Sequence, residues 1–291
     1  MSDLNPFPSL LVSPDELHSA LASSSSRRII PVAAGQNSHV ASFETQHVPG
    51  SVFFNMEEIR DTTSPYPQMM PSATHFAKCM TEIGLRADDI LVVYDALEVG
   101  LYSSPRVAWA CRHFGHRDVH VLNNFPRYVK EGYPTATGSF SALPPQESYP
   151  VKENSNEVIS YDELRELLLS KTKQERYQII DARIPGRFSG AESELNPALR
   201  SGHMPFALNV PLASILGEDK VILPAEELKD LFQKTGVDER PVILTCNSGV
   251  TAAALDLALQ LSGHEMERRL YDGSWMEWTR RAQDEGLVVH D

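Results

Sequence analysis

The feature that most constrains the fold of this chain is the similarity between its two halves. Four pairs of short segments resemble each other in the same order, and the members of each pair lie about half of the 291 residues apart. Solenoid proteins repeat over about 20 to 50 residues, a much shorter period. The spacing therefore predicts two tandem copies of one domain. The paired segments are residues 12–17 with 159–164, 47–55 with 203–209, 91–95 with 242–246, and 114–116 with 262–264.

Each half alternates apolar, β-branched runs with amphipathic stretches of helical composition. This alternation is typical of an α/β fold in which a mainly parallel sheet is flanked by helices. Residues 139–150 are rich in serine and proline, which is a composition typical of linkers. We therefore expect a first domain over residues 1–138 and a second domain over residues 151–291, joined by this linker.

One cysteine stands where an α/β domain of this kind would place a reactive group. Residues 241–245 form an apolar run, Cys246 follows, and a short polar loop leads into an Ala- and Leu-rich run. This pattern predicts a buried strand, a tight turn and the start of a helix. The free N–H groups and the positive dipole end of that helix favour the thiolate form of Cys246. The matching residue of the first half is Asp95, so we expect one active site, in the second half.

Charge and cysteine content argue against several classes of function. A net charge of −13 disfavours direct binding of nucleic acid or of an anionic membrane surface. No apolar run approaches the roughly 20 residues that span a bilayer. Cys79, Cys111 and Cys246 form no CxxC pair, which disfavours a zinc site or a disulfide framework and favours a reducing compartment. We expect no metal and no cofactor, and we interpret Cys79 and Cys111 as small buried apolar residues.

The beginning of the chain does not resemble a secretory signal. Pro6 and Pro8 interrupt it, and no long apolar core follows a basic start. Residues 23–28 are rich in serine and arginine, but Asp15 and Glu16 precede them, which disfavours a mitochondrial presequence. We expect a cytoplasmic protein, with mitochondria as the second candidate compartment.

Further segments, spread over nearly the whole chain, resemble the rhodanese family of sulfurtransferases with two tandem domains, of which the first is inactive. One such fragment alone would be weak evidence, whereas their shared order is specific. The segments are residues 64–67, 69–71 and 100–107 in the first half, and 181–183, 186–188, 201–205, 246–251 and 271–278 in the second.

The resemblance implies a mechanism and the residues that perform it. Cys246 would take a sulfur atom as a persulfide and pass it to a thiol acceptor such as thioredoxin, or to cyanide. Arg187 matches a substrate-binding arginine and would hold a carboxylate by a bidentate contact. Backbone N–H groups of the loop after Cys246 would surround the sulfur. That loop consists of Asn247, Ser248, Gly249, Val250 and Thr251.

The two residues after the cysteine separate donor classes within this family. Members that use thiosulfate carry a basic pair there, which suits a dianion. Here the two residues are Asn247 and Ser248, which are neutral. The chain therefore resembles the members that use 3-mercaptopyruvate, a monoanion, and release pyruvate. Those members usually carry glycine directly after the cysteine, so Asn247 is a departure from their pattern.

Two other family features map less simply onto this sequence. A second arginine aligns with Asn196, and the nearby Arg200 is the alternative candidate. A proton relay that joins the loop serine to an acidic residue and a histidine would fall on Glu57 and Gln68. Because glutamine cannot act as a base, we expect no such relay and expect Ser248 to donate a hydrogen bond to the substrate or leaving group.

Three alternatives stay open alongside a 3-mercaptopyruvate enzyme. The first is a thiosulfate sulfurtransferase. The second is a sulfur carrier that receives persulfide from a cysteine desulfurase and relays it toward tRNA thiolation or cofactor synthesis. The third is a structural double domain with an unreactive Cys246. A phosphatase of related fold is rejected, because it needs an arginine six residues after the cysteine, where this chain has Ala252.

Overall fold

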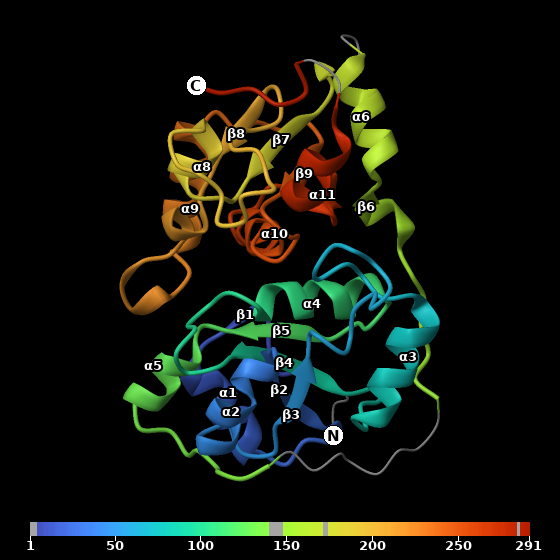
Figure 1. The fold of residues 1–291 in the computed structure, drawn as a ribbon. Coiled ribbons are helices and arrows are strands. Elements are labelled where there is room, and N and C mark those ends of the chain that lie inside the picture. Colours follow the sequence, from blue (N-terminus) through green and yellow to red (C-terminus); the bar gives the residue numbers. More distant parts are fainter. Residues whose placement is uncertain (1–4, 140–147, 171–173, 284–285) are drawn as a thin grey trace. The chain divides into compact units, whose positions relative to one another are not determined.

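The computed structural model describes residues 5–139, 148–170, 174–283 and 286–291 (Figure 1). The chain divides into two compact units. Most of the predicted linker, residues 140–147, lies outside the described residues. The first unit comprises Met1–Thr63, Met70–Asn154 and Glu218–Val221, and the second comprises Ser64–Met69, Ser155–Gly217 and Ile222–Asp291.

Each unit is built on a five-stranded sheet in which every neighbouring pair of strands is parallel. The strand order of the first sheet is β1-β5-β4-β2-β3, and that of the second is β6-β10-β9-β7-β8. The two orders are the same when each strand is matched with its counterpart. The duplication and the parallel α/β fold predicted from the sequence are therefore confirmed. The strands are β1 (Leu11–Val12), β2 (Ile29–Gly35), β3 (Val52–Asn55), β4 (Ile90–Asp95), β5 (Val119–Leu122), β6 (Val158–Ile159), β7 (Gln178–Asp181), β8 (Ala207–Asn209), β9 (Val242–Thr245) and β10 (Arg268–Tyr271).

Helices cover both faces of each sheet, as parallel sheets require. In the first unit, α4 lies on one face, and α1 and α2 lie on the other (Figure 1). The helices of this unit are α1 (Pro14–Ala22), α2 (Val40–Thr45), α3 (Ala73–Glu82), α4 (Ser104–His113) and α5 (Phe125–Lys130). Those of the second unit are α6 (Tyr161–Leu169), α8 (Pro185–Ser189), α9 (Ala225–Lys234), α10 (Ala252–Leu261) and α11 (Ser274–Arg281). Short 3₁₀ turns span Asn37–His39, Ser155–Glu157, Leu212–Ile215 and Glu218–Lys220.

The repeated helix starts have the same physical cause in both halves. The Ser13 hydroxyl accepts a hydrogen bond from the Glu16 amide at the start of α1. Ser160 accepts the equivalent bond from Glu163 at the start of α6. Each serine satisfies an amide that the first helical turn leaves without a partner.

In the second unit, the central strands β7 and β9 are packed between helices on both faces of the sheet. Ile179 of β7 and Ile243 of β9 pack in one cluster with side chains of α6 and α11, including Trp275 and Trp278, which are fully buried. On the other face, α10 packs against β9 and β10. Residues Ala252 to Leu259 of α10, which are alanine and leucine apart from Asp256, are all buried. The strand end that precedes Cys246 is therefore rigidly placed.

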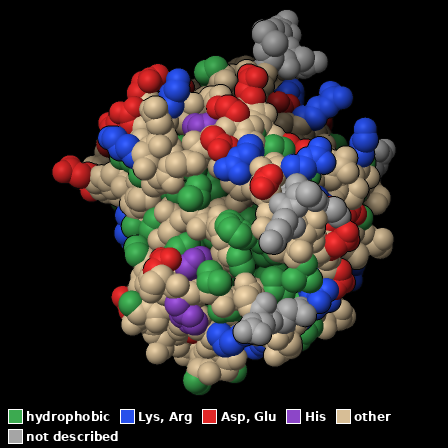
Figure 2. All heavy atoms as spheres, turned by 90° about the horizontal axis from the view of Figure 1, so that it is seen from above, with side chains coloured by type: hydrophobic (Ala, Val, Ile, Leu, Met, Phe, Trp, Pro, Cys, Tyr) green, Lys and Arg blue, Asp and Glu red, His purple; other side chains and the backbone are tan. Residues whose placement is uncertain are grey.

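On the face drawn in Figure 2, basic and acidic side chains are interspersed. No cluster of His, Cys, Asp or Glu among the described residues could hold a metal ion. In the part of the chain that the structure describes, no helix has the length and apolar character needed to cross a bilayer.

Candidate active site

Cys246 lies at the carboxyl end of a central strand. β9 ends at Thr245, the loop follows, and α10 begins at Ala252, so the predicted strand, turn and helix are confirmed. Gly249 has a φ of 79°, in the left-handed region, which allows the loop to turn back toward the helix. The Cys246 side chain is largely buried, and the residue is 2% exposed.

The loop is attached to the N-terminal end of α11. The Cys246 amide donates to the Ser274 hydroxyl at 3.2 Å, and the Cys246 carbonyl accepts from the Trp275 amide at 3.0 Å. The Asn247 carbonyl accepts from the Met276 amide at 3.0 Å. Ser274 in turn donates to the Tyr271 carbonyl at 2.8 Å. These bonds fix the backbone on both sides of the sulfur-bearing residue.

The remaining amides of the loop are available to a ligand. No described group accepts a hydrogen bond from the backbone N–H groups of residues 247–251. Asn247, Ser248 and Thr251 are half-buried, and the Asn247 side-chain oxygen is buried with no hydrogen-bond partner among the described residues. Successive free amides at the start of a helix form a concave site for an anion.

In the first unit, the matching end of the central strand carries a carboxyl group, that of Asp95. Asp95, the last residue of β4, is 1% exposed, and its carboxylate accepts three backbone hydrogen bonds at the start of α4. The donors are the amides of Tyr102 at 3.0 Å, Ser103 at 2.6 Å and Ser104 at 2.9 Å. Burial raises the pKa of Asp95, and the three amide donors oppose that effect. A side chain of the protein thus satisfies the helix-start amides of the first unit, whereas the amides of residues 247–251 in the second unit have no acceptor among the described residues.

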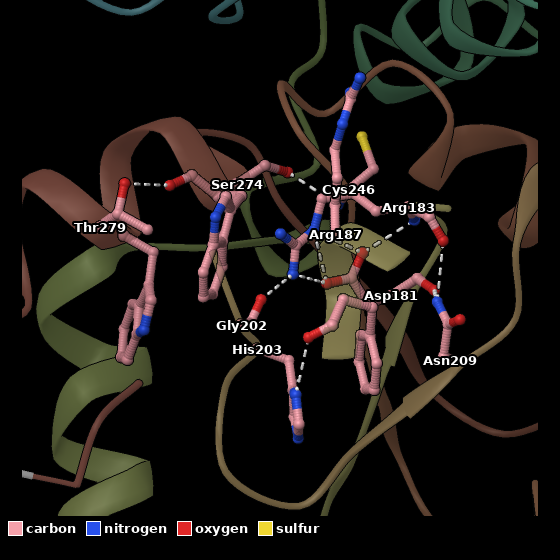
Figure 3. Close-up of polar contacts among 12 residues, drawn as sticks. Asp181, Arg183, Arg187, Gly202, His203, Asn209, Cys246, Ser274 and Thr279 are labelled. Atoms are coloured by element: carbon pink, nitrogen blue, oxygen red, sulfur yellow. Dashed lines mark hydrogen bonds and ion pairs between the residues drawn. The ribbon is translucent and has the colours of Figure 1, made fainter. Parts of the chain in front are cut away.

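Arg187 emerges at the same sheet edge as Cys246. Asp181 at the end of β7 pairs with Thr245 at the end of β9, and parallel strands direct the residues that follow them to one edge. Arg187 lies on the short helix α8, with its side chain 23% exposed. In Figure 3 the side chains of Arg187 and Cys246 extend in the same direction from their separate elements.

A buried charge cluster supports this edge. The Arg183 guanidinium donates to the Asp181 carboxylate at 2.6 and 2.9 Å, to the Glu194 carboxylate at 3.0 Å and to the Gly202 carbonyl at 2.8 Å. Figure 3 shows the contacts of Arg183 with Asp181 and Gly202. The guanidinium also stacks over the Trp275 ring, with 3.9 Å between the guanidinium carbon and the ring centroid. In the sequence, Arg183 is part of a segment that resembles the family, and it has no predicted role there. The available signal was an acidic and a basic residue directly after an apolar strand.

The other candidate residues lie in different surroundings. Arg200 donates through Nη2 to the carbonyl oxygens of Thr279 and Ala282 at the C-terminal end of α11. Glu57 belongs to the first unit, where it accepts a hydrogen bond from the Asn37 amide at 3.1 Å. Gln68 belongs to the second unit and has a left-handed backbone, with a φ of 62°.

Asn196, which aligns with the family's second arginine, forms a local turn. Its side-chain oxygen accepts from the Ala198 amide at 3.0 Å, and its carbonyl accepts from the Leu199 amide. The other two cysteines lie in the core of the first unit as predicted: Cys111 is fully buried and Cys79 is 8% exposed.

Two copies of a five-stranded parallel sheet, with a cysteine loop at the end of a central strand of the second copy, define a tandem rhodanese fold. The rhodanese-like domain family matches residues 160–281. The chain belongs to the tandem-domain rhodanese family and is a sulfurtransferase.

Relatives of the chain divide between two activities. Human 3-mercaptopyruvate sulfurtransferase is 36% identical over 248 residues, which cover 84% of this chain and 81% of the relative. Rat thiosulfate sulfurtransferase is 41% identical over 249 residues, which cover 84% and 82%. Overall identity therefore does not identify the donor.

Solved structures show the same fold over almost the whole chain. The Tum1 protein from Saccharomyces cerevisiae has a TM-score of 0.88 at 33% identity and covers all of both chains. The 3-mercaptopyruvate sulfurtransferase SseA from Escherichia coli has a TM-score of 0.78 at 32% identity, covering 92% of this chain and 99% of its own.

Proposed function

We propose that this sulfurtransferase takes sulfur from 3-mercaptopyruvate through a persulfide on Cys246. The Cys246 thiolate attacks the sulfur of the donor, and the carbon–sulfur bond of the donor breaks. The electron pair of that bond passes to the carbon fragment, which is protonated and leaves as pyruvate. A thiolate acceptor, such as a thioredoxin-type dithiol, or cyanide then attacks the outer sulfur and restores the Cys246 thiolate.

The loop geometry supports the persulfide step. The amides of residues 247–251 have no acceptor among the described residues, and we assign them to stabilising the anionic sulfur of the thiolate and of the persulfide. Asp95 illustrates the preference of this loop position, since its carboxylate takes three amides in the first unit. On this basis we assign the sulfur chemistry to the second domain and a non-catalytic role to the first.

The neutral loop is the single observation that carries the choice of donor. Asn247 and Ser248 are half-buried and bring no positive charge beside Cys246. A dianionic donor would lose its hydration there without a compensating cation, whereas 3-mercaptopyruvate needs one cation for its carboxylate. We assign that contact to Arg187, and we assign a hydrogen bond to the donor or leaving group to Ser248.

The donor assignment is tested by comparing kcat/KM for 3-mercaptopyruvate and thiosulfate on one preparation. We expect a clear preference for 3-mercaptopyruvate with release of pyruvate, and mass spectrometry should find one added sulfur atom on Cys246. Cys246→Ser should abolish both signals. Pyruvate release at the wild-type rate by Cys246→Ser, or a preference for thiosulfate, would overturn the assignment.

A persulfide relay between proteins is the second candidate function. A sulfur transferase subunit of the yeast mitochondrial complex I has the same fold at 31% identity, with a TM-score of 0.84, over 97% of this chain. That relative is a sub-stoichiometric subunit of a mitochondrial complex, which supports a mitochondrial location for this chain. We propose cytoplasm as a further compartment, and a role after a cysteine desulfurase, toward tRNA thiolation or cofactor synthesis. Transfer of labelled sulfur from a desulfurase onto Cys246 would support this function, and fluorescence microscopy of the tagged chain would test the compartment.

A further inference from the structure

Glu194 is a buried carboxylate on an otherwise exposed stretch of chain. The side chain of Glu194 is 1% exposed, whereas the next residue, Leu195, is 84% exposed. An ionised carboxylate is withdrawn from water only where positive partners compensate its lost hydration. We therefore expect positively charged groups next to the two carboxylate oxygens of Glu194.

The two carboxylate oxygens of Glu194 face two different arginines. Oε1 accepts a hydrogen bond from Arg183 Nη1 at 3.0 Å. Oε2 lies 4.0 Å from Nε of Arg187. That nitrogen is buried and donates no hydrogen bond to any described residue. Glu194 thus connects a fixed arginine to the arginine that we assign to the donor.

Arg183 is held too firmly to be the mobile member of this set. Its guanidinium contacts Asp181, the Gly202 carbonyl and the Trp275 ring in addition to Glu194 (Figure 3). Because Asp181 ends β7, the chain of contacts begins at the sheet edge that carries Cys246. Arg183 therefore fixes Glu194, and Glu194 lies against Arg187.

The Arg187 side chain needs a contact with another residue to fix the orientation of its guanidinium. It sits on a five-residue helix, its long side chain is partly exposed, and no described group accepts a hydrogen bond from it. With Nε drawn toward Glu194, the two terminal nitrogens are left for a donor anion, in the geometry that suits a bidentate contact.

We propose that Glu194 is a positioning residue that orients Arg187 toward the donor anion, with Arg183 as its anchor. This proposal rests on the donor-binding role of Arg187 given above. Glu194 itself touches neither the donor nor the sulfur. Its loss should therefore weaken donor binding and leave the second half-reaction, from persulfide to acceptor, unchanged.

The test is a double-mutant cycle that combines Glu194→Gln with Arg187→Met. Glutamine keeps the size of the side chain and an oxygen for Arg183, but removes the charge next to Arg187. We expect KM for 3-mercaptopyruvate to rise about tenfold in Glu194→Gln, with kcat for sulfur transfer to cyanide little changed. In the Arg187→Met background the same substitution should change kcat/KM by less than about twofold.

Two further variants complete the cycle. Glu194→Asp keeps the charge on a shorter side chain and should lie between the wild type and Glu194→Gln; it replaces Glu194→Gln in the cycle if that variant fails to fold. Glu265→Gln removes one negative charge from an exposed residue near the amino end of β10, at the opposite edge of the sheet, and should behave like the wild type.

An unchanged KM in Glu194→Gln would overturn the proposal. An equal loss of kcat/KM on this substitution in the wild-type and Arg187→Met backgrounds would also overturn it. Failure of the donor assignment has a different signature. If the wild type prefers thiosulfate, that assignment falls, and the cycle is then run with thiosulfate, whose charged oxygens need the same guanidinium. Coupling between Glu194 and Arg187 decides the positioning role in either case.

Discussion

At the scale of single residues, Cys246 and Asp95 show how one loop position serves two purposes. Asp95 is the last residue of a central strand, Cys246 directly follows the matching strand, and a loop leads from each to a helix of ten residues. Asp95 uses the helix-start amides to satisfy its own carboxylate, and Cys246 leaves the equivalent amides free. The side chain at this position therefore decides whether the site is closed by the protein or open to a ligand.

Replacement of Asp95 by alanine should destabilise the first unit. Three amides, two of them in buried hydrogen bonds, would lose their acceptor. Each unsatisfied buried group costs about 1–3 kcal/mol, so we expect a loss of more than about 2 kcal/mol in the free energy of unfolding. Asp95→Asn retains one oxygen acceptor and should lose less. Denaturant titration checks both variants, and an unchanged midpoint for Asp95→Ala would show that the carboxylate does not hold this loop.

The other two cysteines should be dispensable for sulfur transfer. Burial raises the pKa of Cys111 to about 12 and also raises that of Cys79, so both thiols stay protonated at neutral pH. Since the thiolate is the nucleophile, the combined variant Cys79→Ser and Cys111→Ala should keep kcat/KM within about twofold of the wild type. Sulfur found by peptide mass mapping on either residue of the wild type would contradict this expectation.

At the scale of elements, the site depends on the hydrogen bonds that join the β9–α10 loop to the start of α11; we call this contact the loop–α11 joint. Ser274, Trp275 and Met276 contact Cys246 and Asn247 through the hydrogen bonds described above. These bonds hold the loop backbone, so side chains within the loop can vary without a change in its path. Donor preference is therefore expected to follow the charge of residues 247 and 248.

A basic pair in the loop should change the donor. In the combined variant Asn247→Arg and Ser248→Lys, two cations would compensate the dianion, and we expect kcat/KM for thiosulfate to rise at least about tenfold, equivalent to about 1.4 kcal/mol in the transition state. The value for 3-mercaptopyruvate should fall. Asn247→Gln with Ser248→Thr, which changes shape without charge, is the control. An equal gain of kcat/KM for thiosulfate in the two double variants would mean that loop shape, and not charge, determines the donor.

Removal of the Ser274 hydroxyl should loosen the joint. The buried Cys246 amide would lose its acceptor, so Ser274→Ala is expected to lower stability by about 1–3 kcal/mol and to reduce the rate of persulfide formation. Thr279→Ala, further along the same helix, removes a hydroxyl that bonds only within α11, to the Trp275 carbonyl, and is the matched control. Calorimetry and single-turnover kinetics measure the two effects, and equal kinetics in both variants would count against the joint.

At the scale of the whole molecule, the duplication extends to details outside the reactive loop. His47 stacks on Phe43 and bonds to its carbonyl in the first unit, and His203 does the same with Phe188 in the second. The matched histidines at residues 116 and 264 differ in their surroundings. His116 is buried and bonds to the Asp89 carbonyl and the Tyr149 hydroxyl, whereas His264 is half-buried and bonds to the Ser262 hydroxyl.

His116 should make folding of the first unit sensitive to acid. Burial lowers its pKa, so the native state holds it neutral while the unfolded chain takes up a proton below about pH 6.5. The free energy of unfolding should therefore fall as the pH decreases from about 7 toward the native pKa, by at most about 1.4 kcal/mol per pH unit for this group. His120, whose pKa burial also lowers, adds to the same trend.

Denaturant titrations at a series of pH values check this expectation. His116→Gln should show a shallower fall in stability on acidification than the wild type. Parallel curves for the wild type and His116→Gln would mean that another group governs the acid response.

The sequence by itself determined the double domain, the parallel α/β fold and the placement of Cys246 and Asp95. These follow from patterns within a few residues: an apolar run before the cysteine, a polar turn and a helix start after it, each repeated at half the chain length. The tertiary structure alone decided which side chains meet across loops. Arg200, a candidate for the site, contacts the end of α11, whereas Arg183 and Glu194, which had no assigned role, form the cluster beside Arg187. The reason is physical: such contacts join residues from separate strand–helix connections, and strand order and helix packing, which local periodicity does not encode, bring those connections together.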